Sequence, residues 1–222
     1  MNLTLFDLDG TLIPMDSDHA FGGFMVDVGW VDGEVWGAKN DEFFAQYNAG
    51  TLDLPAYIAF ATSAWRSRPL AEALAMRERF MAEVMRPQLR PEAVALVEQH
   101  RAAGDLLAIV TATNVFVTEP IATAFGVEHL IAVDLKREAG GQYLGEIDGV
   151  PSFREGKIAR VEAWLQGLGA QWPDFERVTF YSDSTNDLPL LERVSHPVAT
   201  NPSPALARIA AERGWPQLQL FA

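Results

Sequence analysis

The chain has 222 residues, of which 49% are hydrophobic and none is cysteine, so it can bury a large core but has no disulfides or thiolate metal sites. Its formal net charge of −13 argues against a nucleic-acid partner, because an acidic surface repels polyanions. The acids are concentrated in residues 1–65, which hold ten Asp or Glu and a single base, Lys39. No apolar run reaches the length of about 18 residues typical of a membrane span, and no basic leader is present. We therefore expect a cytoplasmic protein without a membrane partner.

The first predicted element is a short buried strand that ends in two carboxylates. An apolar run over residues 3–6 leads directly into Asp7-Leu8-Asp9-Gly10-Thr11. Two ionised groups at the edge of a core repel each other and lose hydration unless a cation or a donor-rich ligand compensates them. A divalent metal and a phosphate at the end of this strand would do so. The alternative is that these aspartates only cap a turn or a helix.

The next seventy residues predict helices inserted after the first strand. From Asp16 to about Arg86 the apolar residues recur at helical spacing, and no alternating run indicates a strand. Pro14 precedes this stretch, and Pro87 and Pro91 follow it, each a natural break. We expect a core made of residues 1–14 and 88–222, with residues 15–87 as a separate helical domain.

Beyond Pro91 the sequence alternates between helix and strand patterns. Helices are expected at 91–103, 115–125, 152–166, 188–194 and 205–213, and strands at 106–110, 130–133, 178–181 and 198–199. Gly140-Gly141 predicts a hairpin running through 143–147, and residues 152–155 have the spacing of a capping box. Buried strands alternating with helices predict an α/β fold with a mostly parallel sheet covered by helices on both faces.

Reactive side chains recur where the predicted strands stop. They are Asp7 and Asp9, Thr111, Lys157 in the first turns of a helix, and Asp183, Asn186 and Asp187. Each has an ordinary alternative, since the threonine and the aspartates could cap helices and the lysine could be solvated. Ligands of parallel sheets bind at the carboxyl ends of the strands, where all these residues would meet. Together they supply the nucleophile, metal ligands and phosphate-binding groups that phosphoryl transfer needs.

This order of motifs resembles the haloacid dehalogenase superfamily of phosphatases, and the helical insertion resembles the cap of its phosphoserine-phosphatase-like branch. The resemblance implies a Rossmann-like core in which Asp7 is the nucleophile that forms an aspartyl-phosphate and Asp9 the general acid and base. It implies Mg2+ held by Asp7, the carbonyl of Asp9 and Asp183, with Asp187 steadying the metal shell or orienting Lys157. Thr111 and Lys157 would grip the phosphate, and the implied further contacts are Gly10, Thr11 and Asn186.

The predicted cap departs from the phosphoserine phosphatase pattern. Asp16 matches the acid expected after the first motif, but the substrate-binding arginine aligns near Ala59, and residues 55–65 contain no base. Asp16 and Asp18 instead favour an ammonium or imidazolium on the leaving group, and this segment resembles a sub-branch that includes histidinol-phosphate phosphatases. The predicted substrate is a small phosphorylated metabolite, an amino-alcohol phosphate such as histidinol phosphate, with phosphoethanolamine and phosphocholine as rivals. The alternative is a promiscuous pocket whose acids merely solvate the cap.

Two other functions use similar residues. A receiver-type switch protein also sets aspartates, a threonine and a lysine around Mg2+, but Asp9 and the helical insertion argue against it. A phosphomutase would return the phosphoryl group to its substrate, and the sequence does not separate it from a hydrolase. Oligomeric state is not predicted by any of these patterns.

Overall fold

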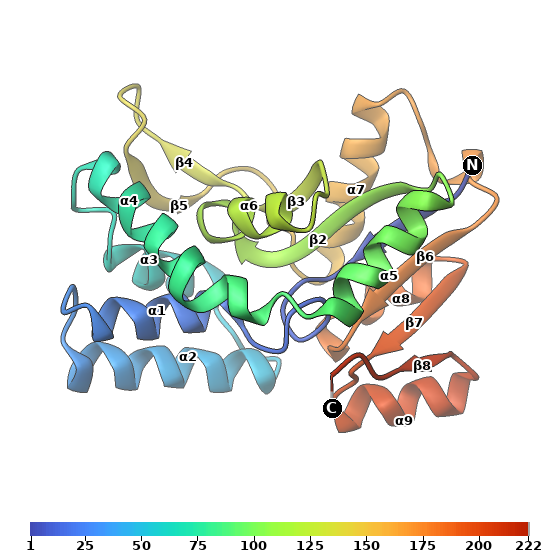
Figure 1. Ribbon diagram of the computed structural model, residues 1–222, viewed down its shortest axis with the longest axis horizontal. Coiled ribbons are helices and arrows are strands. Elements are labelled where there is room, and N and C mark those ends of the chain that lie inside the picture. The colour runs from blue at the N-terminus through green and yellow to red at the C-terminus, as the bar shows by residue number, and fades with distance from the viewer. Residues whose placement is uncertain (222) are drawn as a thin grey trace.

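A six-stranded parallel sheet forms the centre of the protein, whose computed structural model describes residues 1–221 (Figure 1). The strand order is β3-β2-β1-β6-β7-β8, and every neighbouring pair is parallel. The strands are β1 (Leu3–Phe6), β2 (Leu106–Asn114), β3 (His129–Val133), β6 (Val178–Ser182), β7 (His196–Thr200) and β8 (Gln217–Leu218). The predicted α/β class is confirmed.

Helices cover both faces of this sheet because strand side chains alternate between two hydrophobic cores. Phe6 and Ile109 pack with α5 (Pro91–Ala102) and α6 (Val115–Ala124). Leu5 and Val110 point the other way and pack with α7 (Glu155–Gly167), α8 (Leu188–Arg193) and α9 (Pro204–Arg213). Each central strand is therefore apolar on both sides, which explains its continuous run of apolar residues.

The order in which strands are added to the sheet reverses at β1, and this reversal determines where the site lies. From β1 the chain builds β2 and β3 on one side, and later β6, β7 and β8 on the other. Connections diverge from such a switch point, so a crevice opens at the carboxyl ends of the two central strands. Asp7 follows β1 and Asp183 follows β6, so both begin at this crevice.

The segment between β1 and α5 is helical, as predicted. It contains α1 (Ser17–Asp27), η1 (Gly33–Gly37), α2 (Ala38–Asn48), α3 (Leu54–Ser63), α4 (Leu70–Phe80), η2 (Met81–Met85) and η3 (Arg86–Gln88). These helices lie beside the sheet in Figure 1, together with the hairpin β4 (Leu135–Arg137) and β5 (Tyr143–Ile147). Buried Trp65 joins the parts, since its ring stacks on Phe116 of α6 at 3.9 Å and meets Tyr143 of the hairpin edge-on at 5.1 Å.

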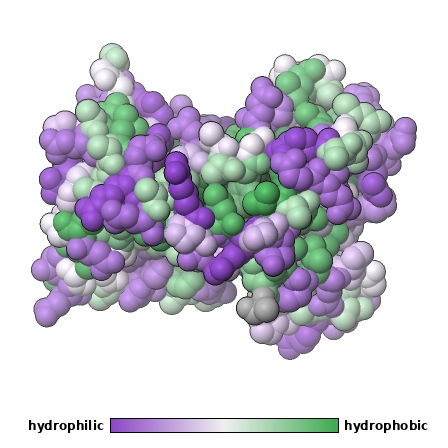
Figure 2. Space-filling model, viewed as in Figure 1, coloured by the Kyte–Doolittle hydropathy of each residue, from purple (hydrophilic) through white to green (hydrophobic). Residues whose placement is uncertain are grey.

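On the face shown in Figure 2, hydrophilic side chains cover much of the helical segment and of the part that contains the sheet, and apolar side chains gather between these two parts. Among the described helices, none combines the length and the apolar character that crossing a bilayer requires.

Two local predictions were wrong. Strand β2 continues to Asn114, beyond the predicted end at residue 110, so Thr111 and Thr113 lie within it. The capping box at Ser152 does not form: α7 begins at Glu155, and the Ser152 hydroxyl donates to the Ile131 carbonyl at 3.1 Å. Ser152 is fully buried, so satisfying a strand carbonyl replaces the local cap. The two-residue strand β8 was not predicted.

Candidate active site

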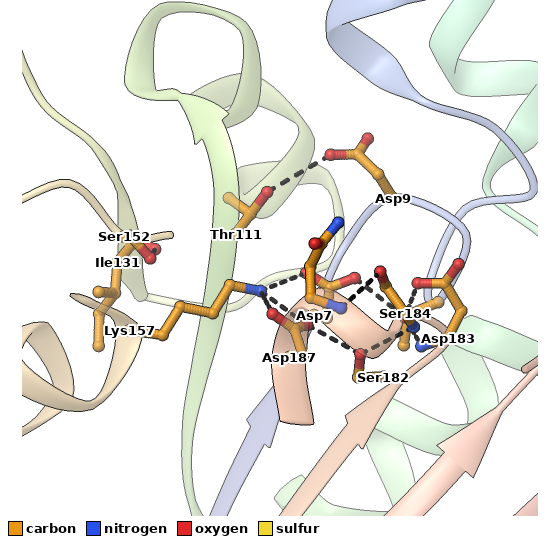
Figure 3. A network of polar contacts seen from close by, with 12 residues as sticks. Asp7, Asp9, Thr111, Ile131, Ser152, Lys157, Ser182, Asp183, Ser184 and Asp187 are labelled. Atoms are coloured by element: carbon orange, nitrogen blue, oxygen red, sulfur yellow. Dashed lines mark hydrogen bonds and ion pairs between the residues drawn. The ribbon is translucent and has the colours of Figure 1, made fainter. Parts of the chain in front are cut away.

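The predicted motif residues converge at the carboxyl ends of the central strands (Figure 3). Asp7 follows β1, Thr111 lies in β2, Lys157 lies in α7, and Asp183 follows β6. The side chain of Lys157 points between Asp7 and Asp187, while Asp9 faces Thr111 from the other side of the site. Residues separated by up to 176 positions in the numbering thus share one pocket edge.

Lys157 is a buried ammonium between two buried carboxylates. Its Nζ lies 2.9 Å from Asp7 Oδ1 and 2.7 Å from Asp187 Oδ1, and its side chain is 1% exposed. Burial alone would lower the pKa of Lys157, but the charges of Asp187 and Asp7 outweigh it and raise that pKa above its usual value. Ser182 donates to Asp187 at 2.8 Å, so Asp187 is held in place and orients the lysine.

Asp7, which the resemblance implies is the nucleophile, lies beside this ammonium. Burial raises its pKa to about 7, against the lowering effect of Lys157 and with a further increase from the charges of Asp187 and Asp9. One of its oxygens is held by Lys157, and the other accepts a hydrogen bond from the Thr11 hydroxyl at 3.0 Å. The carboxylate orientation is therefore set from two sides.

The loop after β1 approaches Asp183 closely because of Gly10. Gly10 has φ +75°, and a Cβ there would lie 2.4 Å from Asp183 Oδ2, so only glycine allows this approach. The Asp183 N–H donates to Thr11 Oγ1 at 3.1 Å. The Gly10 N–H donates to the Met15 carbonyl at 3.2 Å, and the Thr11 N–H to Leu8, so neither backbone donor points freely into the site.

The charges around Asp183 fit a hard cation. Burial and the neighbouring charges of Asp7 and Asp187 raise the pKa of Asp183 well above its ordinary value. Lys157 is the nearby base, so three carboxylates face one ammonium. Within residues 1–221 no three acidic or histidine side chains form a metal-ligand cluster by themselves. The set implied by the resemblance needs only two carboxylates, Asp7 and Asp183, and a backbone carbonyl, and oxygen donors of this kind suit Mg2+.

Asp9 is held by donors that the sequence did not single out. Its Oδ1 accepts from the Ser17 N–H at 2.7 Å, and its Oδ2 accepts from Thr113 Oγ1 at 2.9 Å and from Thr111 Oγ1 at 3.4 Å. Burial and the charge of Asp16 raise the pKa of Asp9 to about 6. Thr113 would have been identified by the period of two along a strand, had the strand been extended past residue 110.

A narrow pocket extends from these residues under the helical segment. Its walls are acidic and aromatic, and in the described part of the chain they include no Lys or Arg: Asp7, Asp9, Asp16, Asp18, Phe43, Phe44, Tyr47, Leu52, Leu54, Tyr57, Thr111, Ala112 and Thr113. Arg66 lies outside this lining and donates to the Ala59 carbonyl at 2.7 Å, while Arg68 lies over the Trp30 ring. Trp36 likewise stacks on Phe60 at 4.4 Å, so the two tryptophans pack within the helical segment.

The predicted acids of this pocket have different partners. Asp16 caps α1 by accepting from the His19 N–H at 2.8 Å, and burial raises its pKa to about 6. Asp18 accepts from Asn114 Nδ2 with both oxygens, each at 3.1 Å. His19 pairs with exposed Asp41 at 2.8 Å and stacks on Phe44 at 4.5 Å.

Two contacts hold the end of α2 over the pocket. Asn186 Nδ2 donates to the Tyr47 carbonyl at 3.1 Å, so this side chain joins the sheet to the helical segment, and its N–H donates to Ser184. The guanidinium of Arg154, a residue with φ +51°, donates to the Gly50 carbonyl. About 30 Å³ of free space remains inside, enough for a water molecule.

Comparisons with known proteins identify relatives of the whole chain. The model of the haloacid dehalogenase-like hydrolase family matches residues 4–192. A histidinol-phosphatase of Neisseria meningitidis serogroup C (strain 8013) is 40% identical over 217 residues, which cover 98% of each chain. A crystal structure of a protein with unknown function from Bordetella pertussis Tohama I is 48% identical, covers 99% of each chain and has a TM-score of 0.93. A substrate-bound phosphoserine phosphatase, 16% identical with a TM-score of 0.68, covers 97% of this chain and 91% of its own and shares the fold.

The chain belongs to the haloacid dehalogenase-like hydrolase family. Within this family it is a phosphatase.

Proposed function

We propose that the protein hydrolyses phosphomonoesters through an aspartyl-phosphate on Asp7. An Asp7 oxygen forms a bond to phosphorus as the bond to the leaving alcohol breaks, and Asp9 gives its proton to the alcohol oxygen. Asp9 then takes a proton from water, whose oxygen attacks phosphorus and releases inorganic phosphate and free Asp7. The contact that carries the proposal is Lys157 Nζ to Asp7 Oδ1 at 2.9 Å, because this ammonium offsets the repulsion between a carboxylate and a dianionic ester.

The proposed cofactor is Mg2+, held by Asp7, Asp183 and the carbonyl of Asp9. When bound, the ion would neutralise charge on the transferring phosphoryl group. Thr111 and Lys157 are the proposed phosphate-binding side chains, with Gly10, Thr11 and Asn186 shaping the loops around them. Asp187 takes the second of its two predicted roles in this proposal, since it contacts Lys157 and Ser182.

The proposed substrate is a small amino-alcohol phosphate such as histidinol phosphate. The pocket lining supports it, because in the described residues all its charged side chains are acids, which would repel a carboxylate on the leaving group and attract an ammonium. The Neisseria relative, named a histidinol-phosphatase, supports the same choice. We further propose that residues 15–87 form a cap over the core of residues 1–14 and 88–222. The cytoplasmic location stays a prediction.

Turnover of a panel of phosphomonoesters tests this function. With Mg2+, purified protein should release inorganic phosphate catalytically, and histidinol phosphate should exceed phosphoserine in kcat/KM. Asp7→Asn should lower kcat by roughly a thousandfold or more, because the nucleophile is lost. Removing Mg2+ with a chelator should stop the reaction, and adding Mg2+ should restore it.

Three results would contradict parts of the proposal. A single stoichiometric phosphorylation without turnover would indicate a receiver-type switch. Transfer of the phosphoryl group to another hydroxyl of the substrate would indicate a phosphomutase. Normal activity in Asp7→Asn would remove the nucleophile from its role.

A further inference from the structure

Asp18 is a buried carboxylate in the pocket with no basic partner. It is 5% exposed and lies in the lining of the pocket. Burial, together with the charge of Asp9, raises its pKa to about 7. Two buried acids outside this wall do have basic partners: Asp187 contacts Lys157 at 2.7 Å, and Asp105 contacts His100 at 2.7 Å. Because a buried charge without a counter-charge is costly, Asp18 needs an explanation.

The chemistry proposed above does not use Asp18. Asp7 and Asp183 face the phosphoryl end, and Asp9 serves as acid and base. Asp16 caps α1 by accepting a hydrogen bond from the His19 N–H, and its carboxylate also lines the pocket. Asp18 does not cap the helix, since within residues 1–221 its carboxylate accepts from the Asn114 side chain and from no backbone N–H.

Asp18 is held in one orientation by the core. Both of its oxygens accept from Asn114 Nδ2 at 3.1 Å. Asn114 cannot turn easily, because its Oδ1 caps α6 by accepting from the Val117 N–H at 3.3 Å. The Tyr57 phenol of α3 also lines the pocket, and its hydrogen bonding lowers the pKa of Asp18. These donors are neutral, so they orient the carboxylate but leave its charge uncompensated.

A carboxylate fixed in this way is a preorganised acceptor for a charged or strongly polarised N–H group. We propose that Asp18, oriented by Asn114 and Tyr57, is a second subsite for the leaving group and binds a cationic or N–H-donating group distant from the ester. This inference rests on the proposed function, and it assigns the ammonium nearer the ester to Asp16, which lines the same pocket. The substrate class is then an alcohol phosphate with two nitrogen donors, and Asp18 is the residue that distinguishes it from smaller amino-alcohol esters.

The test compares three esters in the full-length protein. Histidinol phosphate has an ammonium and an imidazole, phosphoethanolamine has only an ammonium, and p-nitrophenyl phosphate has neither. Asp18→Asn removes the charge and keeps one acceptor oxygen for Asn114, while the other oxygen is replaced by an amide NH2. In this variant the ratio of kcat/KM for histidinol phosphate to that for phosphoethanolamine should fall roughly tenfold to a hundredfold, the effect of one charge-assisted hydrogen bond.

The matched control is Asp16→Asn, which should lower kcat/KM for both amine esters relative to p-nitrophenyl phosphate and leave their mutual ratio within about threefold. A merely structural role of Asp18 would lower all three values by the same factor. That uniform loss, or an unchanged ratio, would overturn the subsite.

A second measurement separates failure of the subsite from failure of the proposed substrate. If the wild-type protein does not hydrolyse histidinol phosphate, the substrate assignment is wrong, and the subsite is judged from inhibition of p-nitrophenyl phosphate hydrolysis. Histamine carries both nitrogen groups and should inhibit more strongly than ethanolamine in the wild type, with the difference lost in Asp18→Asn. Equal inhibition by the two amines in the wild type, or a difference that persists in the variant, would overturn the subsite.

Discussion

The buried acids at the two ends of the pocket differ in whether a basic side chain compensates their charge. At the sheet end, Asp7 and Asp187 share the ammonium of Lys157, and a hard cation would balance the remaining charge near Asp183. At the end under the helical segment, Asp9, Asp16 and Asp18 line a wall without any Lys or Arg in the described chain. The two ends therefore differ in charge compensation, since a buried ammonium contacts the acids of one end and, within residues 1–221, none contacts those of the other. In the proposed function, the phosphate would bind at the first end and the amine of the leaving group at the second.

The largest effect on stability and activity is expected from removing the ammonium of Lys157 at the sheet end of the pocket. Lys157→Met would leave two buried carboxylates without their base, and we expect a loss of about 3–5 kcal/mol in the free energy of unfolding. Activity should fall by roughly a hundredfold or more, because charge stabilisation of the phosphoryl group is lost. Urea unfolding and kcat measure the two effects.

Lys136→Met is the control for this change, since Lys136 forms an exposed pair with Glu146 at 2.9 Å. Its stability should stay within about 0.5 kcal/mol of the wild type. Equal stability losses in the two variants would contradict the special role of the buried lysine.

Asp18, which has no basic partner, should affect how the stability of the protein depends on pH. The folded pKa of Asp18 is about 7 and its ordinary value is 3.8, so between these values the folded state holds a proton that the unfolded chain has lost. Wild-type stability should therefore fall as pH rises through this window. Asp18→Asn lacks that loss and should gain on the order of a few kcal/mol relative to wild type between pH 4 and pH 8.

Unfolding of the metal-free proteins across this pH range measures the difference. Asp9, which faces Asp18, and Asp16 are present in both proteins, so their contributions largely cancel. Parallel stability curves for the two proteins would show that Asp18 titrates normally.

The hydroxyl of Thr113 is expected to position Asp9 for proton transfer. Thr113→Val removes the hydroxyl that contacts Asp9 at 2.9 Å and should misalign the proposed acid. We expect kcat to fall roughly tenfold to a hundredfold for alkyl esters, and less for p-nitrophenyl phosphate, whose leaving group needs little protonation. Thr113→Ser should recover activity, and equal losses for both kinds of ester would exclude a role through Asp9.

The smallest effect is expected at the contact that closes the pocket. Asn186→Ala removes the hydrogen bond to the Tyr47 carbonyl, worth about 1 kcal/mol. KM should change by no more than about fivefold, with the loss shared by all esters because the contact does not touch the leaving group. A change confined to histidinol phosphate would instead place Asn186 within the substrate site.

Much of the architecture could be predicted because it is written in local patterns. The apolar strand before Asp7, the helical periodicity from residue 16 to about residue 86 and the glycine stops of the helices each depend on neighbours within a few positions. The failed prediction at Ser152 has a non-local cause. Ser152 has the spacing of a helix cap, but a buried carbonyl of β3, distant in the sequence, competes for its hydroxyl.

The sequence by itself determined the phosphoryl end of the site, because parallel strands must bring Asp7, Thr111 and Asp183 to one edge of the sheet. Only the tertiary structure decided which donors hold these acids. Lys157 donates to Asp187, Thr113 donates to Asp9, and Asn114 donates to Asp18. These hydrogen bonds join residues up to 104 positions apart. The physical reason is that hydrogen bonds and burial depend on distances in the folded chain, which no spacing along the sequence expresses.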